Sequence, residues 1–592
     1  MLKTTIQEKR PKRILLSGVF GPFGVDDAYG RKENIMELFH NQVTKAQEMG
    51  SWRFQHRSFG LYFLAANIHA DVTILDFPSR KRFMRELEKG YDVVGISFIT
   101  PNFIKAKEMT RLTRKISPAS TILIGGHGAA IDGVEHLLDC DHVIKGEGIR
   151  WLRSYLGEDP DAPFVHPTLS IADRQSAFGV PFPGVGANLL VPGVGCVNGC
   201  KFCSTTHFFG RTYTAFLSTG KQIFETAKRI ADERGIDEFF IMDENFLKDR
   251  QRAQELLAEM ERHGRYFTFH IFSSAETIMA FGVDNLVRLG VNFVWIGFEA
   301  SSSKGNFEKN EGIDPKGLTQ ELRDRGIIVL ASGILCQEHH TRENIQTDID
   351  FMVALEADLV QFMLLTPLPV TALYQDHKER GLLREDLPFE EWHGQKYLTY
   401  RHPEFPGNSA EKYLMAAFRK DYEVNSSSMY RIVETVFRGY RHLAGLSRRD
   451  ACLKTRMEQF RRRTLEYATI LPLVARYAVN KTEHQRATAL DRQISELFGR
   501  PAVQERLRRI AIRALALRWK VRCRLLGDRI QPSTIVSRFG PGAKKAATVW
   551  GRMVPSPKAI GALASYLPQP FRKWAHQVRL LKLSAFRPRS TI

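Results

Sequence analysis

Short apolar runs alternate with amphipathic, helix-like runs through the first 160 residues. Strands are expected at Arg13–Gly18, Asp71–Asp76, Tyr91–Phe98, Thr121–Gly125 and His142–Ile144. Helical patterns such as Ser79–Lys89 and Ile104–Ile116 lie between them. Continuously apolar strands separated by helices predict a parallel sheet that is covered on both faces. We therefore expect a Rossmann-like α/β domain over residues 11–160, with ligands bound beyond the carboxyl ends of its strands.

The same alternation resumes after a segment rich in Pro and Gly, residues 161–187, which we interpret as a linker. Strands are expected at Leu189–Pro192, Glu238–Met242, Phe267–Ile271, Phe293–Gly297, Ile327–Leu330 and Leu359–Met363. Six such strand–helix units predict a partial (β/α)6 barrel of the TIM type over residues 188–400. In such barrels the functional side chains stand at the carboxyl ends of the strands.

Residues 401–592 have a different composition and are predicted to form a mostly α-helical, basic region. The first half of Arg506–Leu525 suits a basic amphipathic helix, and Phe571–Leu583 has a similar composition. From Leu517 to Leu525 basic and apolar residues alternate strictly, and this pattern allows a strand.

The net charge of +20 is concentrated in this last region. Residues 411–592 hold 38 Lys and Arg against 12 Asp and Glu, whereas the preceding part is slightly acidic. Such asymmetry indicates an anionic partner. Basic residues beside Trp, Leu and Phe favour an anionic membrane surface. The alternatives are a solvated basic face on an accessory helical domain, or RNA, although no RNA-binding signature is present and nucleic acid is disfavoured.

The chain lacks the segments that would place it in or across a membrane. Its first ten residues contain no apolar signal core, and no stretch approaches about eighteen uninterrupted apolar residues. We expect a cytoplasmic protein, with peripheral attachment to the inner face of the membrane as the further option.

Three cysteines carry the clearest chemical signal: Cys196, Cys200 and Cys203, with the spacing C-x-x-x-C-x-x-C. Three thiolates on one loop can hold three irons of a [4Fe-4S] cluster and leave the fourth iron open to a small molecule. Structural zinc requires four closed ligands, and no second cysteine pair stands nearby. A disulfide framework fits small secreted chains rather than this one.

With Phe202 between the last two cysteines, this loop resembles the signature of the radical S-adenosylmethionine (SAM) superfamily. The resemblance implies that SAM chelates the open iron and is cleaved, after electron transfer, to methionine and a 5′-deoxyadenosyl radical. It also implies an electron donor such as flavodoxin or ferredoxin.

Two segments of the first domain, Ile122–Ala129 and Asp141–Gly148, resemble the cobalamin-binding domain that precedes many radical SAM cores. The resemblance implies that cobalamin is held by turn residues: Ser17, Ser97, Thr100, Gly125, Gly126, His127, Gly146 and Glu147. The motif D-x-H-x-x-G, whose histidine ligates cobalt, is absent from residues 1–150, and so is G-x-G-x-x-G. For His127, a turn histidine bonded to the backbone is the alternative interpretation.

Polar side chains cluster at successive strand ends of the predicted barrel, in Asp243-Glu-Asn245, Ser273–Glu276 and Gly297-Phe-Glu299. Carboxylates there can accept hydrogen bonds from ribose hydroxyls or an ammonium group, although Asp243 and Ser273 could instead cap helices. Together with Thr366–Tyr374, in which Val370 stands where relatives usually have Gly, these segments resemble the cobalamin-dependent radical SAM group. The resemblance implies contacts to SAM from Phe202, Asp243, Glu244, Ser273, Gly297 and Glu299.

These features predict an enzyme that functionalises an unactivated carbon, most simply by methylation through cobalamin. The substrate is a small molecule or, given the basic apolar tail, a membrane lipid such as an isoprenoid. The alternatives are radical cyclisation, carbon–carbon coupling or rearrangement without methyl transfer, and a cofactor-binding protein without catalysis. An RNA-modifying enzyme of the methylthiolating type is disfavoured because only Cys140 precedes Cys196. No catalytic acid, base or radical relay is evident.

Overall fold

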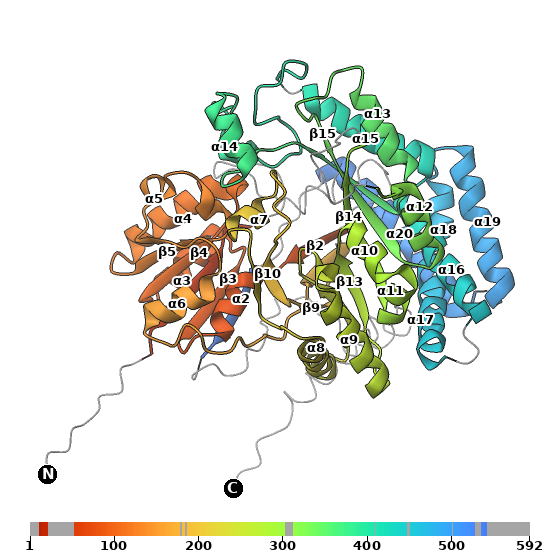
Figure 1. The fold of residues 1–592 in the computed structure, drawn as a ribbon, viewed down its shortest axis with the longest axis horizontal. Coiled ribbons are helices and arrows are strands. Elements are labelled where there is room, and N and C mark those ends of the chain that lie inside the picture. Colours follow the sequence, from red (N-terminus) through yellow and green to blue (C-terminus); the bar gives the residue numbers. More distant parts are fainter. Residues whose placement is uncertain are drawn as a thin grey trace, which may run out of the picture.

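The computed structural model describes residues 11–21, 52–177, 180–183, 186–301, 312–407, 409–446, 450–499, 501–526 and 534–540. An N-terminal α/β unit, orange in Figure 1, lies beside a second strand–helix unit drawn in yellow and green. The C-terminal helices, drawn in blue, pack on the side of the second unit that faces away from the first. The predicted basic segment Phe571–Leu583 lies outside the described residues.

The first unit is built on a six-stranded sheet with the order β17-β3-β1-β4-β5-β6. Five strands run parallel: β1 (Arg13–Gly18), β3 (Asp71–Asp76), β4 (Val93–Ser97), β5 (Thr121–Gly125) and β6 (His142–Val143). From β1 the chain passes to β3 on one side of it, and then crosses to β4 on the other side. The strand order therefore reverses between β1 and β4. Ligands of doubly wound sheets bind at such a switch point, here at the pair Gly18 and Ser97.

Both faces of this sheet are buried, which explains the continuous apolar runs. One face packs under α3 (Arg80–Leu87) and α4 (Phe103–Ile116), with Leu15, Val94 and Ile124 inward. The opposite face packs under α2 (Phe59–Ala66) and α6 (Gly148–Leu156). Its core also contains Leu189 and Val191, so the first unit shares a hydrophobic core with the beginning of the second.

The second unit is an open parallel sheet of six strands with the order β16-β15-β14-β13-β12-β9. The strands are β9 (Asn188–Leu190), β12 (Glu238–Ile241), β13 (Thr268–Phe272), β14 (Val291–Glu299), β15 (Ile328–Leu335) and β16 (Leu359–Leu364). Helices α8 (Gly220–Arg234), α9 (Arg250–His263), α10 (Ala275–Phe281), α11 (Val283–Leu289), α12 (Pro315–Asp324) and α13 (Ile345–Ala354) connect them. The predicted partial barrel is therefore confirmed, with its strands where the apolar runs placed them.

Two small sheets accompany these units. Within the interval interpreted as a linker, β7 (Ala172–Ala177) and β8 (Val180–Pro183) form a hairpin, and β2 (Trp52–His56) pairs with β7. The hairpin of β10 (Gly193–Gly195) and β11 (Tyr213–Ala215) encloses the segment that contains the three cysteines.

The C-terminal region is helical, as expected: α15 (Ser409–Asn425), α16 (Ser428–Leu446), α17 (Ala451–Tyr467), α18 (Leu471–Arg476), α19 (Lys481–Phe498) and α20 (Val503–Leu526). The first three of these helices share the barrel's own hydrophobic core through residues such as Leu414, Val436 and Phe460. None of the helices in the described part of the chain combines the length and apolar character needed to cross a bilayer.

The strand considered for Leu517–Leu525 was wrong, because α20 is helical through this segment. Its apolar residues also recur at intervals of three and four along the whole helix, and this longer pattern decides the structure. The chain does return as a strand shortly afterwards. Strand β17 (Ile535–Phe539) adds to the edge of the N-terminal sheet, antiparallel to β3, and Ser537 lies 3.1 Å from the hydroxyl of Tyr62.

The contact between Gly326 and Gly439 gives a direct test of how tightly α16 packs on the barrel. A Cβ atom at Gly439 would lie 2.5 Å from the Cα of Gly326, backbone against backbone. We expect Gly439→Ala to lower the free energy of unfolding by about 1–3 kcal/mol in urea denaturation. Gly445→Ala on the same helix is the control, since a Cβ there meets nothing within 4 Å. Equal effects of both substitutions would contradict this packing.

Candidate cofactor site

The cysteine loop begins where β10 ends. Gly195 has a φ of +92°, and a Cβ atom on it would lie 2.2 Å from the carbonyl oxygen of Thr212 in the facing strand region. Only glycine fits there, so the chain can turn out of the strand directly into Cys196. Cys203 stands at the opposite end of the loop, as the residue that precedes helix α7 (Ser204–Phe208).

Hydrogen bonds within the loop hold the three cysteines in one turn. The hydroxyl of Thr206 donates to the carbonyl of Cys196 (2.6 Å) and accepts from the N–H of Gly199 (3.3 Å). The N–H of Cys203 donates to the carbonyl of Cys200 (3.1 Å). These bonds fix the backbone of the loop, and backbone N–H groups of Asn198, Thr205 and Thr206 also donate to the thiols of Cys196 and Cys203.

The electrostatics of the thiols fit an iron–sulfur cluster. Burial raises the pKa of Cys203 to about 11, with repulsion from Glu244 and Cys200 adding to the effect. Burial likewise raises the pKa of Cys196, and Glu244, Cys200 and Asp243 raise it further. Mutual repulsion shows that the thiols lie close to one another and to the acidic end of β12. Because burial and repulsion favour the protonated thiols, a bound cation is needed to hold them as thiolates, and soft sulfur donors select iron–sulfur clusters or other soft metals.

The first predicted carboxylate, Asp243, is anchored rather than free. Its Oδ2 accepts hydrogen bonds from the guanidinium of Arg252 and the hydroxyl of Tyr213, both at 2.7 Å. Arg252 also donates to the Tyr213 hydroxyl at 2.7 Å, and the side chains of Asp243 and Arg252 are almost completely buried. The capping alternative is excluded for helix α9, which is capped by Asp249. Asp243 thus fixes the end of β12 against the hairpin that carries the cysteines.

The adjacent Glu244, unlike Asp243, is not buried in an ion pair. Its side chain is accessible to water, yet the dense protein around it raises the pKa of its carboxyl to about 7, and repulsion from Asp243 contributes. A hydrogen bond from Thr205, two residues after Cys203, opposes the shift. Glu244 is therefore an acidic group beside the thiols whose environment favours a cationic ligand.

Asn245 organises the next strand end, and the sequence analysis did not include it in the site. Its Oδ1 accepts from Ser273 (3.1 Å) and Thr277 (3.1 Å), and its Nδ2 donates to Ser274 (2.8 Å). The predicted SAM contact Ser273 is buried in this network. The sequence indicated Asn245 only through its place in the polar run Asp243-Glu-Asn245. Its hydrogen-bond partners lie about thirty residues away, so no local pattern could reveal them.

The third strand end, in β14, has an irregular backbone. The register with β15 shifts between Gly297 and Glu299, and Glu299 has a φ of +67°. A non-glycine residue in this region is strained, and such strain persists only where surrounding contacts hold it. Glu299 is buried, and the residue two positions later, Ser301, is fixed from the neighbouring helix.

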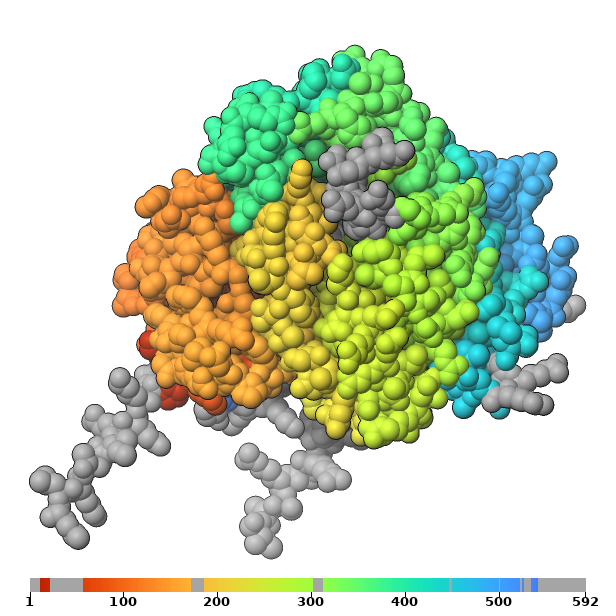
Figure 2. Space-filling model, in the orientation of Figure 1, coloured from red at the N-terminus to blue at the C-terminus, as the bar shows by residue number. Residues whose placement is uncertain are grey.

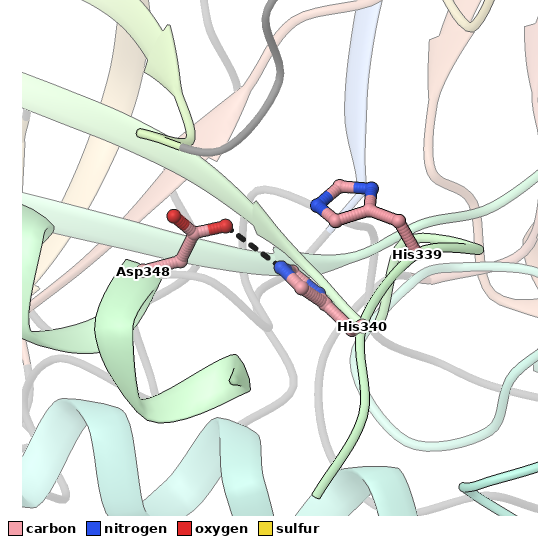
Figure 3. A group of neighbouring side chains, drawn as sticks. All are labelled: His339, His340 and Asp348. Atoms are coloured by element: carbon pink, nitrogen blue, oxygen red, sulfur yellow. Dashed lines mark hydrogen bonds and ion pairs between the residues drawn. The ribbon is translucent and has the colours of Figure 1, made fainter. Parts of the chain in front are cut away.

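Asp348, which fixes Ser301, belongs to a trio of side chains beyond the carboxyl end of β15 (Figure 3): His340 and Asp348 are buried, and His339 is exposed. Asp348 accepts from the N–H of Ser301 (2.9 Å), from its hydroxyl (2.5 Å) and from Nε2 of His340 (2.7 Å). Nδ1 of His340 accepts from the N–H of Gln337 (3.0 Å). Both ring nitrogens of His340 are therefore engaged, so we assign the trio to positioning of the strand ends rather than to a metal.

The predicted cobalamin residues gather at the carboxyl edge of the first sheet. Ser17 is fully buried, Thr100 begins the short helix after β4, and a Cβ atom on Gly126 would lie 2.8 Å from Oγ of Ser97. At Gly125, by contrast, an added Cβ would meet nothing within 4 Å. The turn therefore leaves room above the end of β5.

His127 and Glu147 differ in the hydrogen bonds that their side chains make. Nδ1 of His127 is buried without a hydrogen-bond partner among the described residues, and burial lowers the pKa of the ring to about 4. An orphaned acceptor in a turn beside open space fits a bound cofactor. Glu147 instead caps helix α6 by accepting from the N–H groups of Ile149 and Arg150, while the preceding Gly146 has a φ of +79°.

The two candidate cofactor sites meet at helix α7. The ring of His127 packs on Phe208 at the end of this helix, with centroids 4.6 Å apart. Since α7 has five residues and begins after Cys203, about 8 Å of helix separates the cysteine loop from the turn of the first domain. Helix α14 (Ala372–Glu379) rests on the first domain (Figure 2) and reaches both sites: the N–H of Leu373 donates to the carbonyl of Lys201 (3.0 Å), and Lys378 pairs with Asp132.

Comparison with known families agrees with this division of the chain. Residues 49–154 match the family described as the B12 binding domain, and residues 190–352 match the radical SAM superfamily. The site geometry thus defines a class: radical SAM enzymes that carry a cobalamin-binding domain. The chain combines these two domains, and they imply a [4Fe-4S] cluster, SAM and cobalamin as its cofactors.

Individual relatives are distant. The chain is 23% identical over 363 residues to an uncharacterized methyltransferase of Pyrococcus horikoshii, covering 53% of this chain and 77% of the relative. It is 24% identical over 375 residues to bacteriochlorophyllide d C-12(1)-methyltransferase of Chlorobaculum tepidum, covering 60% and 79%. It is 23% identical over 380 residues to hopanoid C-3 methylase of Methylococcus capsulatus, covering 57% and 71%.

The assignment of the cluster ligands can be tested by metal analysis. We expect Cys196→Ala, Cys200→Ala and Cys203→Ala each to lose most of the iron and sulfide after anaerobic reconstitution, because two thiolates cannot hold a cubane cluster. Cys452→Ala serves as the control. Cys452 is a buried residue of α17 that contacts the carbonyl of Arg288, so this variant should retain full iron content. Normal iron content in any of the three loop variants would remove that cysteine from the ligand set.

The buried pair of His340 and Asp348 makes a separate prediction about stability. Asp348→Ala leaves Ser301 and His340 without their acceptor, and we expect it to lower the free energy of unfolding by about 2–4 kcal/mol. Asp350→Ala, on the same helix, removes a surface ion pair with Lys420 and should cost less than about 1 kcal/mol. Chemical denaturation of both variants gives the comparison, and similar losses would show that Asp348 does not hold the strand ends.

Proposed function

We propose that this protein is a cobalamin-dependent radical SAM methyltransferase that transfers a methyl group to an unactivated carbon of its substrate. The observation that carries the proposal is the short helix α7, which begins at Cys203 and ends on His127 of the cobalamin-binding turn. When bound, the cluster with SAM supplies hydrogen-atom abstraction, and cobalamin supplies a methyl carrier. A substrate between the two sites would reach both.

The chain's own residues prepare this space. Cys196, Cys200 and Cys203 hold the cluster and leave one iron open. Glu244 offers a carboxylate to the cationic or hydroxylated parts of SAM. We further propose that Phe202, Ser273, Gly297 and Glu299 shape the SAM site and that Asp243 positions its neighbours through Arg252.

The substrate class is proposed to be a lipid or another apolar small molecule. Supporting this choice are the similarity to a hopanoid C-3 methylase and the basic helix α20, which exposes apolar side chains. A small electron-transfer protein such as flavodoxin or ferredoxin would reduce the cluster in the cytoplasm. The substrate class and the electron donor are proposed separately from the methyl-transfer chemistry, which rests on the cofactor sites.

The test is an anaerobic assay with cobalamin-loaded protein, a reductant and SAM labelled in its methyl group, on lipid extracts and on soluble metabolites. We expect a corrinoid spectrum, release of 5′-deoxyadenosine, and label in a methylated lipid product. Deoxyadenosine formation with an unlabelled, rearranged or cyclised product would replace methyl transfer by one of the other radical outcomes. A corrinoid spectrum without deoxyadenosine would indicate a protein that binds cofactors but does not catalyse.

A further inference from the structure

Helix α20 carries apolar side chains on two opposite faces, and within the described part of the chain only one of these faces is packed against other helices. The inner face contributes Ala516 and Trp519, which are buried against Leu473 of the neighbouring helix α18. Arg509 on the same side forms an ion pair with Asp491 of α19 at 2.7 Å. These contacts fix the rotation of α20, so the opposite face points away from the C-terminal helices, with which α20 lies side by side in Figure 1.

The outer face forms a continuous apolar stripe. Its large side chains are exposed by 37% to 75%: Val503, Leu507, Ile510, Leu517, Val521 and Leu525. With the exposed Ala514, these positions recur every three or four residues over 24 residues of helix, a length of about 36 Å. Single exposed apolar residues are ordinary, but a contiguous row of this length indicates an interaction surface.

Positive charge borders the stripe on both sides. Helix α20 contains eight Lys and Arg and a single acidic residue, Glu505. At about 100° per residue, the exposed Arg506, Arg513 and Arg524 fall along one margin of the stripe and Arg518 along the other. A helix with an apolar face bordered by arginines is suited to lie in the interface of a membrane that contains anionic lipids.

The same charges disfavour the other occupants of the stripe. A second copy of α20 would bring like-charged margins together. Residues 541–592 of this chain hold ten Lys and Arg and no Asp or Glu, so this segment is also repelled by the arginines. We propose that the outer face of α20 docks the protein on an anionic membrane surface. Membrane docking rests on the proposed function, because it would bring the protein to a lipid substrate. The docking test requires neither cofactor nor turnover, so the docking and the proposed function can fail independently.

The experiment is vesicle flotation of the full chain. Vesicles of phosphatidylcholine with about one third phosphatidylglycerol are compared with vesicles of phosphatidylcholine alone, at low and high salt. We expect binding to the anionic vesicles that weakens at least tenfold on neutral vesicles and in high salt. Absence of binding to the anionic vesicles would overturn the proposal. Concentration-dependent dimerisation that is lost in Leu517→Asp would overturn it in favour of a second copy.

Variants distinguish binding through the apolar stripe of α20 from non-specific attraction of a basic protein to anionic vesicles. Val521→Asp and Leu517→Asp alter side chains that are 52% and 59% exposed, and each should weaken vesicle binding at least tenfold. Val424→Asp on α15, where the side chain is 54% exposed, is the matched control and should bind as the unaltered protein does. Arg513→Gln with Arg518→Gln should reduce binding and its salt dependence. If the stripe variants and the control bind equally well, the membrane contact lies elsewhere and the proposal is wrong.

Discussion

The contact between His127 and Phe208 is the constraint on which the rest of the molecule depends. It joins a turn at the end of one parallel sheet to a helix that begins after Cys203, a proposed iron ligand, near the end of another. Because both sheets bind ligands beyond their carboxyl ends, this contact makes the two edges face each other. The shared core around Leu189 and Val191, and helix α14 above it, keep this arrangement rigid.

Around this junction, polar residues divide into those that are already satisfied and those that are left for ligands. Asp243, Asn245 and Asp348 are buried, and each accepts several hydrogen bonds from neighbouring elements. They hold successive strand ends at fixed positions, as a site that must orient a reactive cofactor requires. Glu244 and His127 differ: the first has a raised pKa and the second an unpartnered nitrogen. A cationic ligand group beside Glu244 and a polar partner for His127 would stabilise both side chains.

The sequence predicted the strands and the cysteine loop because both depend on local patterns. Continuous apolar runs such as Arg13–Gly18 fall within observed strands, and the spacing of the three cysteines is a property of one loop. The pairing of Asp243 with Arg252 could not be predicted, because it depends on how helix α9 is rotated against β12. Strand β17 was missed because its partner lies more than 450 residues earlier, and a five-residue segment with only three apolar residues does not specify which sheet edge it joins.

The two candidate cofactor sites lie within the length of one short helix, α7. The most direct measurement is electron paramagnetic resonance of the fully loaded protein, poised so that the cluster and the cobalamin each hold an unpaired electron. We expect each signal to be broadened or split by the other, because only about 8 Å of helix separates the cysteine loop from the turn that contains His127. A spectrum that is the plain sum of the two isolated centres would contradict it.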